Sequence, residues 1–124
     1  MARELSTILV VDDEPNMRFL VRVTLEQAGY VVLEAHHGAA ALALASESPP
    51  DLVITDLMMP VMGGRELIDR LRSNPATASI PIIVLSANGS LRAGDADVAL
   101  DKPFEVDELL ANVRTLAQKE EATE

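Results

Sequence analysis

The feature that most constrains the fold of this chain is a series of short runs of valine, isoleucine and leucine. Most of these runs are continuous rather than alternating with polar residues. Continuous apolar runs are typical of strands that are buried on both faces, as in a parallel sheet covered by helices. Five runs punctuate the chain, at residues 8–11, 31–33, 52–54, 80–85 and 98–100, and the last is the weakest. We therefore expect a sheet of five parallel strands.

Between these runs lie segments in which apolar residues recur at the spacing of one helix face. Pro15 stands where the first turn of a helix tolerates proline, and Gly29 stands where a C-terminal cap belongs. The face of this first helix expected to point inward consists of Met17, Leu20, Val21, Thr24, Leu25 and Ala28. Further helices are expected over residues 39–45, from about Gly63 to Leu71, and over residues 106–117. Strands that alternate with helices predict right-handed crossovers and a doubly wound α/β fold.

The charge of the chain limits its partners, since ten Lys and Arg against twenty Asp and Glu give a formal net charge of −10. Such a charge repels nucleic-acid phosphates and suits a divalent cation or a basic partner, so we expect no direct contact with nucleic acid. The lack of cysteine excludes disulfides, thiolate metal sites and cysteine nucleophiles. No apolar run approaches the roughly 20 residues of a membrane span, and the first residues lack the apolar stretch of a signal peptide. We therefore expect a cytoplasmic chain without membrane contact.

Polar residues collect at the ends of four of the five predicted strands. They are Asp12, Asp13 and Glu14 after the first, Asp56 after the third, Ser86 after the fourth, and Asp101 and Lys102 after the fifth. Because ligands of such sheets bind beyond the carboxyl ends of the strands, we expect these groups to converge at one edge. Clustered carboxylates need a cation to stay ionised together, and oxygen-only ligands suit Mg²⁺ or Mn²⁺.

This set of groups has a definite chemical interpretation. A carboxylate beside a divalent cation can act as a nucleophile towards phosphorus, with Lys102 neutralising the transferring oxygens and Ser86 donating a hydrogen bond to one of them. The ordinary alternative is that Asp12 and Asp13 cap the first helix, whose N-terminus favours anions, and that Asp56 is a polar strand end. Each alternative is credible alone, but together they do not explain why suitable groups stand at four strand ends.

Four segments of the chain resemble the receiver domain of two-component response regulators, similar to single-domain chemotaxis-type receivers. They are residues 8–14, which open on the first strand and its aspartates, 51–64 around Asp56, 80–87 with Ser86, and 101–104 with Lys102. The resemblance implies a receiver domain over residues 5–118, followed by an acidic C-terminal tail over residues 119–124. It also implies a flavodoxin-like sheet of strand order 2-1-3-4-5 with helices on both faces.

The resemblance assigns a role to each matching acidic position. Asp56 would accept a phosphoryl group, and would share in binding Mg²⁺ or Mn²⁺. Asp13 would ligate the cation directly, whereas Asp12 would act largely through water. The backbone carbonyl of Met58 would supply a further ligand.

The resemblance also implies how the acceptor works and with which proteins. Ser86 and Lys102 would bind the phosphoryl group, and the bond between Lys102 and Pro103 is expected to be cis, as proline allows. The phosphoryl group would come from a sensor histidine kinase or a histidine phosphotransfer protein, and a downstream protein target would read the result. Such a domain is not an enzyme but takes part in its own phosphorylation and dephosphorylation.

Two features depart from the common pattern of the family. The segment between Ser86 and Lys102 looks one to two helical turns short, at about 3.6 residues a turn, and it carries two glycines. We therefore expect the fourth helix to be short or irregular, and we expect residues 87–94 to carry the response to phosphorylation. Ala99 stands where many receivers have an aromatic residue, so the usual coupling of a ring to the switch hydroxyl is missing.

Other functions stay open at this point. A phosphotransferase of the haloacid dehalogenase type also uses an aspartate nucleophile, but it requires a second aspartate where this chain has Met58. A nucleotide- or flavin-binding domain is disfavoured because the chain has no glycine-rich phosphate-binding motif. A receiver-like scaffold that works without phosphorylation is kept open by the altered segment before Lys102. The chain is either a stand-alone receiver or one domain of a longer regulator.

Overall fold

The computed structural model describes residues 6–59, 61–86 and 96–121. In these ranges, strands and helices alternate up to the fourth strand: β1 (Thr7–Val11), α1 (Pro15–Gln27), β2 (Val31–Ala35), α2 (Gly38–Glu47), β3 (Leu52–Asp56), α3 (Gly64–Ser73), β4 (Ile82–Ser86), β5 (Val98–Asp101) and α4 (Val106–Glu121). All neighbouring strands are parallel, in the order β2-β1-β3-β4-β5. The predicted five-stranded parallel sheet and its strand order are confirmed.

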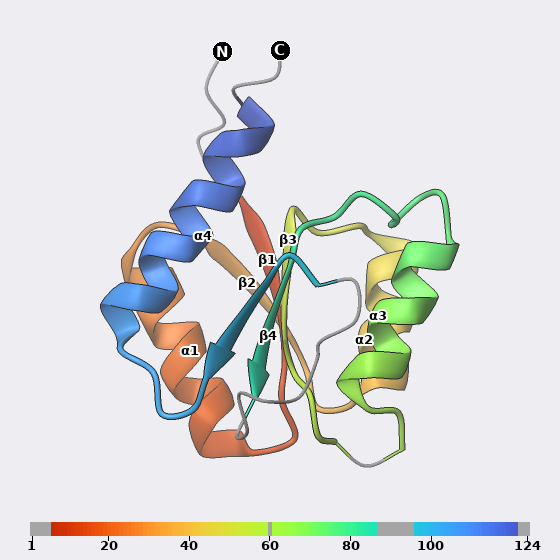
Figure 1. Ribbon diagram of the computed structural model, residues 1–124, viewed down its shortest axis with the longest axis horizontal. Coiled ribbons are helices and arrows are strands. Elements are labelled where there is room, and N and C mark those ends of the chain that lie inside the picture. The colour runs from red at the N-terminus through yellow and green to blue at the C-terminus, as the bar shows by residue number, and fades with distance from the viewer. Residues whose placement is uncertain (1–5, 60, 87–95, 122–124) are drawn as a thin grey trace.

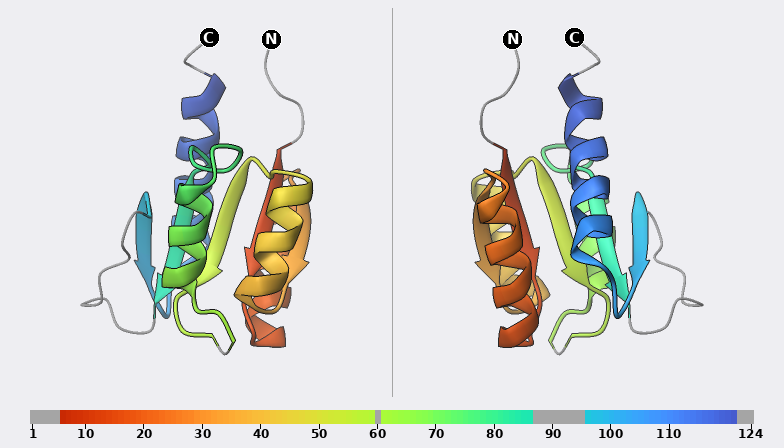
Figure 2. Two further views of the ribbon diagram at one scale, coloured as in Figure 1. Left: turned by 90° about the vertical axis from the view of Figure 1, so that its right-hand side faces the viewer. Right: turned by 90° about the vertical axis from the view of Figure 1, so that its left-hand side faces the viewer.

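The helices cover the two faces of the sheet in pairs (Figure 1). Helices α2 and α3 lie in front of the sheet in the left panel of Figure 2, and α1 and α4 lie in front of it in the right panel. Each pair closes its own apolar cluster, so the sheet separates two cores. The doubly wound arrangement expected from the alternation of runs and helical periods is therefore the observed one.

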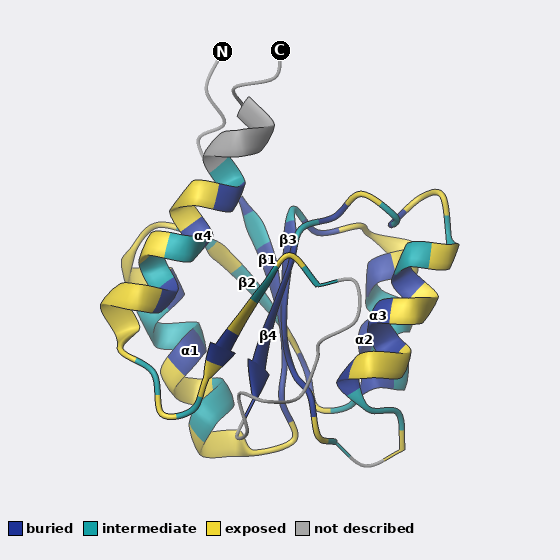
Figure 3. Cartoon of the chain, in the orientation of Figure 1, coloured by how far each residue is buried: buried dark blue, intermediate teal, exposed yellow. Residues whose placement is uncertain are grey.

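Burial follows the position of each strand in the sheet (Figure 3). Every residue of β3 and β4, two inner strands, is buried. The edge strands are less buried: Val31 of β2 is 41% exposed, and Ala99 of β5 is exposed. An edge strand has a neighbour on one side alone, so its apolar run is shorter and weaker.

The inward face of α1 is narrower than predicted. Val21 and Leu25 are buried, whereas Leu20, which the periodicity placed on the same face, is 45% exposed. Val21 and Leu25 are four residues apart and form one stripe that packs on the sheet, and a residue next to that stripe in sequence is turned by about 100°. The prediction for Leu20 was wrong for this reason.

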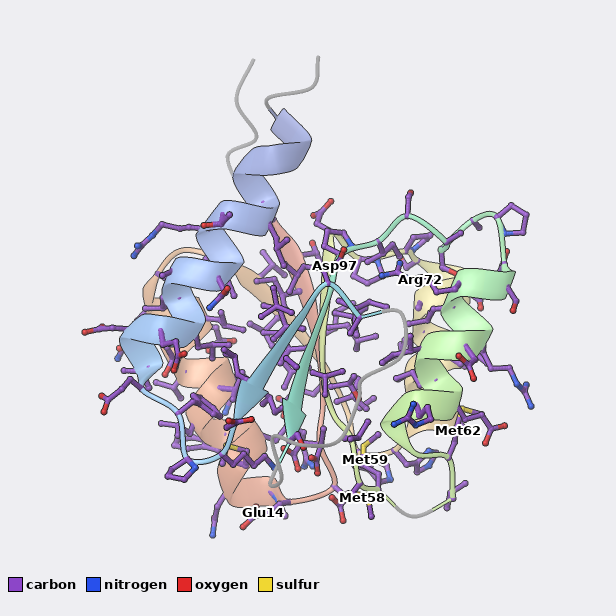
Figure 4. All side chains as sticks on the ribbon, viewed as in Figure 1. Glu14, Met58, Met59, Met62, Arg72 and Asp97 are labelled. Atoms are coloured by element: carbon purple, nitrogen blue, oxygen red, sulfur yellow. The ribbon has the colours of Figure 1, made fainter. Side chains whose placement is uncertain are left out.

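The region between β4 and β5 was expected to hold a short or irregular helix. That expectation falls on residues 87–95, which lie outside the described residues. The start of β5 is anchored by Asp97, whose Oδ2 accepts hydrogen bonds from the Ile82 N–H at 2.8 Å and from Arg72 Nη2 at 3.0 Å. Figure 4 shows Arg72 and Asp97 at the opposite edge of the sheet from Glu14 and Met58.

The last helix is longer than the periodicity indicated. Helix α4 continues to Glu121, so residues 119–121, which were assigned to the acidic tail, extend the helix. The proposed division into a domain over residues 5–118 and a tail over 119–124 stays a prediction.

Candidate functional site

Three carboxylates meet at the carboxyl edge of the sheet. Strands β1 and β3 are paired in parallel, with Val11 opposite Thr55, so the residues that follow them emerge side by side. One oxygen from each of Asp12, Asp13 and Asp56 lies within 4.8 Å of the others. Asp12 is 1% exposed and Asp56 is 7% exposed, whereas Asp13 is exposed. The strand ends thus bring together the acidic residues that the sequence placed at one edge.

Lys102, which follows the edge strand β5, reaches this cluster. The Lys102 Nζ lies 3.3 Å from Asp56 Oδ1 and 3.7 Å from Asp12 Oδ2. Its backbone N–H donates to the Ser86 carbonyl at 2.7 Å, which ties the end of β5 to the end of β4. The peptide bond between Lys102 and Pro103 is cis, as the family resemblance implied.

Asp12 is the most deeply buried member of the cluster. Its Oδ1 accepts a hydrogen bond from the Glu14 N–H at 2.9 Å, while its buried Oδ2 has no hydrogen-bond partner. Burial raises the pKa of Asp12, and the nearby charges of Asp56 and Asp13 add to that rise, against the lowering effects of the Glu14 N–H and Lys102. A buried carboxylate oxygen without a donor, beside two further carboxylates, suits a bound cation.

Replacing Asp12 by asparagine is expected to stabilise the protein without divalent cations. A carboxyl group with a raised pKa holds its proton more tightly in the folded state than in the unfolded chain. The free energy of unfolding therefore falls as pH rises from the ordinary aspartate value through the raised one, and the cost persists at neutral pH. Asp12→Asn removes this cost, so the variant is expected to melt at a higher temperature than the wild type.

Thermal unfolding at neutral pH in a chelator measures this difference. Mg²⁺ should then raise the Tm of the wild type more than that of Asp12→Asn, because the variant has lost a carboxylate of the cluster. If the variant melted below the wild type in chelator, the ionised Asp12 carboxylate would not destabilise the folded protein, and this prediction would be wrong.

Ser86 and Met58 lie at the same edge with different exposure. Ser86 ends β4, is 3% exposed, and stands next to Lys102 through the backbone bond just described. Met58 follows Asp56 by two residues and is 69% exposed. The structure therefore places Ser86 beside the cluster, and the cation-binding role of the Met58 carbonyl stays a prediction.

The loop after β3 is held by two close backbone approaches. The Gly64 N–H donates to the Leu57 carbonyl at 2.9 Å, and the Gly38 N–H donates to the Met62 carbonyl at 3.2 Å. A Cβ on Gly64 would lie 2.3 Å from the carbonyl oxygen of Asp56, so this approach requires glycine. Met62 packs on the core beneath α2 and α3, so this methionine is a packing residue.

Two groups that contact the site region were not predicted from the sequence. Arg18 of α1 donates to the Asp12 carbonyl, and Glu34 of β2 pairs with Arg18. An arginine on a helix and a glutamate on an edge strand have the pattern of solvated surface residues. No signal in the sequence distinguishes them from such residues.

Together, the fold and the site define a doubly wound α/β domain with a cluster of three carboxylates, able to hold a cation, at the carboxyl edge of its sheet. The chain belongs to the response regulator receiver domain family, whose pattern it matches over residues 8–114. It is thus a receiver domain of the two-component type, a signalling domain, and this membership favours the receiver over the haloacid dehalogenase and nucleotide-binding alternatives.

Known relatives include regulators, kinases and isolated receivers. The chain is 42% identical to the DNA-binding dual master transcriptional regulator RpaA of Synechocystis over 90% of its own length and 49% of RpaA. It is 44% identical to the sensor histidine kinase TmoS of Ectopseudomonas mendocina over 88% of its own length and 12% of the kinase. Among solved structures, TrrA of Thermotoga maritima in complex with Mg²⁺ and BeF is 36% identical, with a TM-score of 0.82, covering 90% of this chain and 98% of TrrA.

The chain spans about half the length of the regulator it matches and a smaller part of the kinase. The matched region therefore occurs in both kinds of protein. The activities of the full-length regulator and kinase are properties of those proteins. In the described part of this chain, no helix combines the length and hydropathy needed to cross a bilayer.

Proposed function

We propose that Asp56 is the phosphoacceptor of this receiver, and that it takes its phosphoryl group from a sensor histidine kinase or a histidine phosphotransfer protein. The observation that carries the proposal is the position of Asp56 Oδ1, 3.3 Å from Lys102 Nζ, inside a cluster of three carboxylates. Asp56 is 7% exposed, so it is largely buried rather than lying on the open surface.

Mg²⁺ or Mn²⁺ is the cofactor that fits these residues best. Three carboxylates and one lysine leave an excess of negative charge, and the buried Asp12 Oδ2 accepts no hydrogen bond, although Lys102 Nζ lies 3.7 Å away. Asp13 would hold the ion directly, Asp12 largely through water, and Asp56 together with the Met58 carbonyl would complete the protein ligands. When bound, the ion supplies charge neutralisation at the oxygens of the transferring group.

For phosphoryl transfer, the chain mainly positions the reacting groups and offsets charge on the transferring oxygens. A carboxylate oxygen of Asp56 attacks the phosphorus of the donor phosphohistidine, a phosphorus–oxygen bond forms, and the phosphorus–nitrogen bond breaks. The electron pair of the broken bond goes to the imidazole nitrogen of the donor. Lys102 offsets charge on the transferring oxygens, and the Ser86 hydroxyl donates to one of them.

The output of the domain is also part of the proposal. Ser86 and Lys102 would be drawn towards the added charge, which in many receivers reorients an aromatic ring on the fifth strand. Ala99 lies opposite Val84 in the β4–β5 register and has no ring to reorient. We therefore assign the response to residues 87–94, which lie outside the described residues, and to a downstream protein that reads them.

Further expectations follow from this assignment. The domain acts on no second substrate and so is not an enzyme in the usual sense, although it takes part in its own phosphorylation and dephosphorylation. The lack of direct nucleic-acid contact, on grounds of charge, and the cytoplasmic location stay predictions.

A small phosphodonor tests the proposal without the cognate kinase. With acetyl phosphate and Mg²⁺, intact mass should show one added phosphoryl group, and none in a chelator. Lys102→Met should slow incorporation about 100-fold, the usual loss when one donor to a developing charge is removed. A wild-type chain that stays unmodified at high donor and high Mg²⁺ would contradict the proposal and favour the phosphorylation-independent scaffold.

A further inference from the structure

The backbone of Asp12 is held at both ends of the residue. Its N–H donates to the Ala35 carbonyl of β2 at 3.1 Å. Its carbonyl accepts a hydrogen bond from Arg18 Nη1 of α1 at 2.8 Å. The second contact fixes the peptide plane between Asp12 and Asp13, and hence the direction from which the Asp13 side chain departs.

Arg18 is itself fixed by a second element of the fold. Its Nε lies 3.1 Å from Glu34 Oε1, and Glu34 Oε2 lies 3.0 Å from Arg22 Nε. Glu34 of β2 is paired with Val10 of β1, and Val10 lies two residues before Asp12 in the sequence. One guanidinium thus bridges the end of β1 to β2, and the rigid fork of arginine makes both contacts at once.

We propose that Arg18 is a positioning residue of the cation site, acting through the Asp12 carbonyl to aim the Asp12 and Asp13 carboxylates at one point. The inference rests on the proposed function, because it assigns a role in a site that Mg²⁺ would occupy. This contact matters most for Asp13, because Asp13 is exposed and burial does not orient its side chain. Arg18, at 22% side-chain exposure, is shielded enough for its contacts to persist.

Charge and position make opposite predictions for the removal of Arg18. A positive charge near carboxylates competes with a bound cation, so by Coulomb's law alone its removal strengthens Mg²⁺ binding. Loss of a contact that orients the ligands weakens binding, typically 10- to 100-fold for groups behind metal ligands. The sign of the change in affinity therefore separates the two effects.

Arg22 provides a matched control on the same helix. It is also an arginine of α1 paired with Glu34, and it also contacts Glu26. Within the described residues it makes no hydrogen bond to the Asp12 carbonyl. Calorimetric titration of Mg²⁺ into purified protein should show about tenfold weaker binding in Arg18→Met than in the wild type. Arg22→Met should bind as the wild type does, although each variant loses an ion pair with Glu34.

A conservative variant controls for misfolding of Arg18→Met. Arg18→Lys keeps a positive charge that can reach Glu34, but its single ammonium cannot reproduce the two-way fork. It should melt near the wild type in chelator and still bind Mg²⁺ several-fold more weakly. Full recovery of affinity in Arg18→Lys would overturn the inference.

The outcomes distinguish this inference from the proposed function. If the wild type binds no Mg²⁺, the proposed function fails and the role of Arg18 fails with it. If the wild type binds Mg²⁺ and Arg18→Met binds it equally or more tightly, the positioning role alone is wrong. Equal weakening in Arg18→Met and Arg22→Met would also overturn it, because the common loss would then be the pair with Glu34.

Discussion

In Asp56→Asn, phosphoryl incorporation from a small donor with Mg²⁺ is expected to fall to background. Asparagine keeps the size of aspartate and an oxygen towards Lys102, which lies 3.3 Å from Asp56 Oδ1, so the local packing is retained. The amide is not a nucleophile towards phosphorus, whereas the carboxylate is. Intact mass after incubation with donor measures the difference, and the far-ultraviolet circular dichroism of the variant should match that of the wild type.

Asp13→Asn provides the control for this variant. It removes one carboxylate of the cluster and leaves the acceptor in place, so incorporation should be slow at low Mg²⁺ and should recover as Mg²⁺ is raised. Asp13→Ala should weaken Mg²⁺ binding more than Asp12→Ala, because direct ligation contributes more than a contact through water. Residual incorporation in Asp56→Asn equal to that of the wild type would place the acceptor on another residue.

Gly64→Ala is expected to cause the largest loss of stability among single methyl additions at this edge. The added Cβ would lie 2.3 Å from the Asp56 carbonyl oxygen and 2.9 Å from the Leu57 Cα, and both neighbours are backbone atoms. Because the backbone of β3 cannot give way without disturbing the sheet, we expect a loss of about 3 kcal/mol. Denaturant unfolding monitored by circular dichroism measures it as a lower midpoint.

The neighbouring glycine is the matched control. Gly63 has φ −75° and ψ 173°, which any residue adopts, and its added Cβ would lie 3.3 Å from the Leu57 carbonyl oxygen. Gly63→Ala should therefore cost less than about 1 kcal/mol. Equal midpoints for Gly64→Ala and Gly63→Ala would show that the close approach at Gly64 is not a constraint.

The inner strands could be predicted from the sequence because burial on both faces leaves a continuous apolar run. Strands β3 and β4 are the clearest cases, since each of their residues is buried. The inward face of α1 was predicted too wide, because periodicity gives the direction of a face but not its width. The width depends on how closely the sheet approaches, and Leu20 lies outside the stripe that packs.

Much of the candidate site could be located from the sequence by the rule that parallel strands end at one edge. That rule predicts that Asp12, Asp13, Asp56 and Lys102 lie together, and the distances bear out their proximity. Arg18 could not be found in this way. Its link to Asp12 depends on the turn between β1 and α1, and that geometry has no sequence pattern of its own.

The most direct test of the account is to map the acceptor residue in the wild type. After incubation with donor, borohydride reduces an acyl phosphate to an alcohol, and peptide mass mapping then locates the altered residue. We predict that the alteration falls on Asp56, that it requires Mg²⁺, and that a chelator abolishes it. Alteration of a different carboxylate, or alteration of Asp56 that is equal in chelator, would contradict the central claim that Asp12, Asp13, Asp56 and Lys102 form one cation-dependent acceptor site.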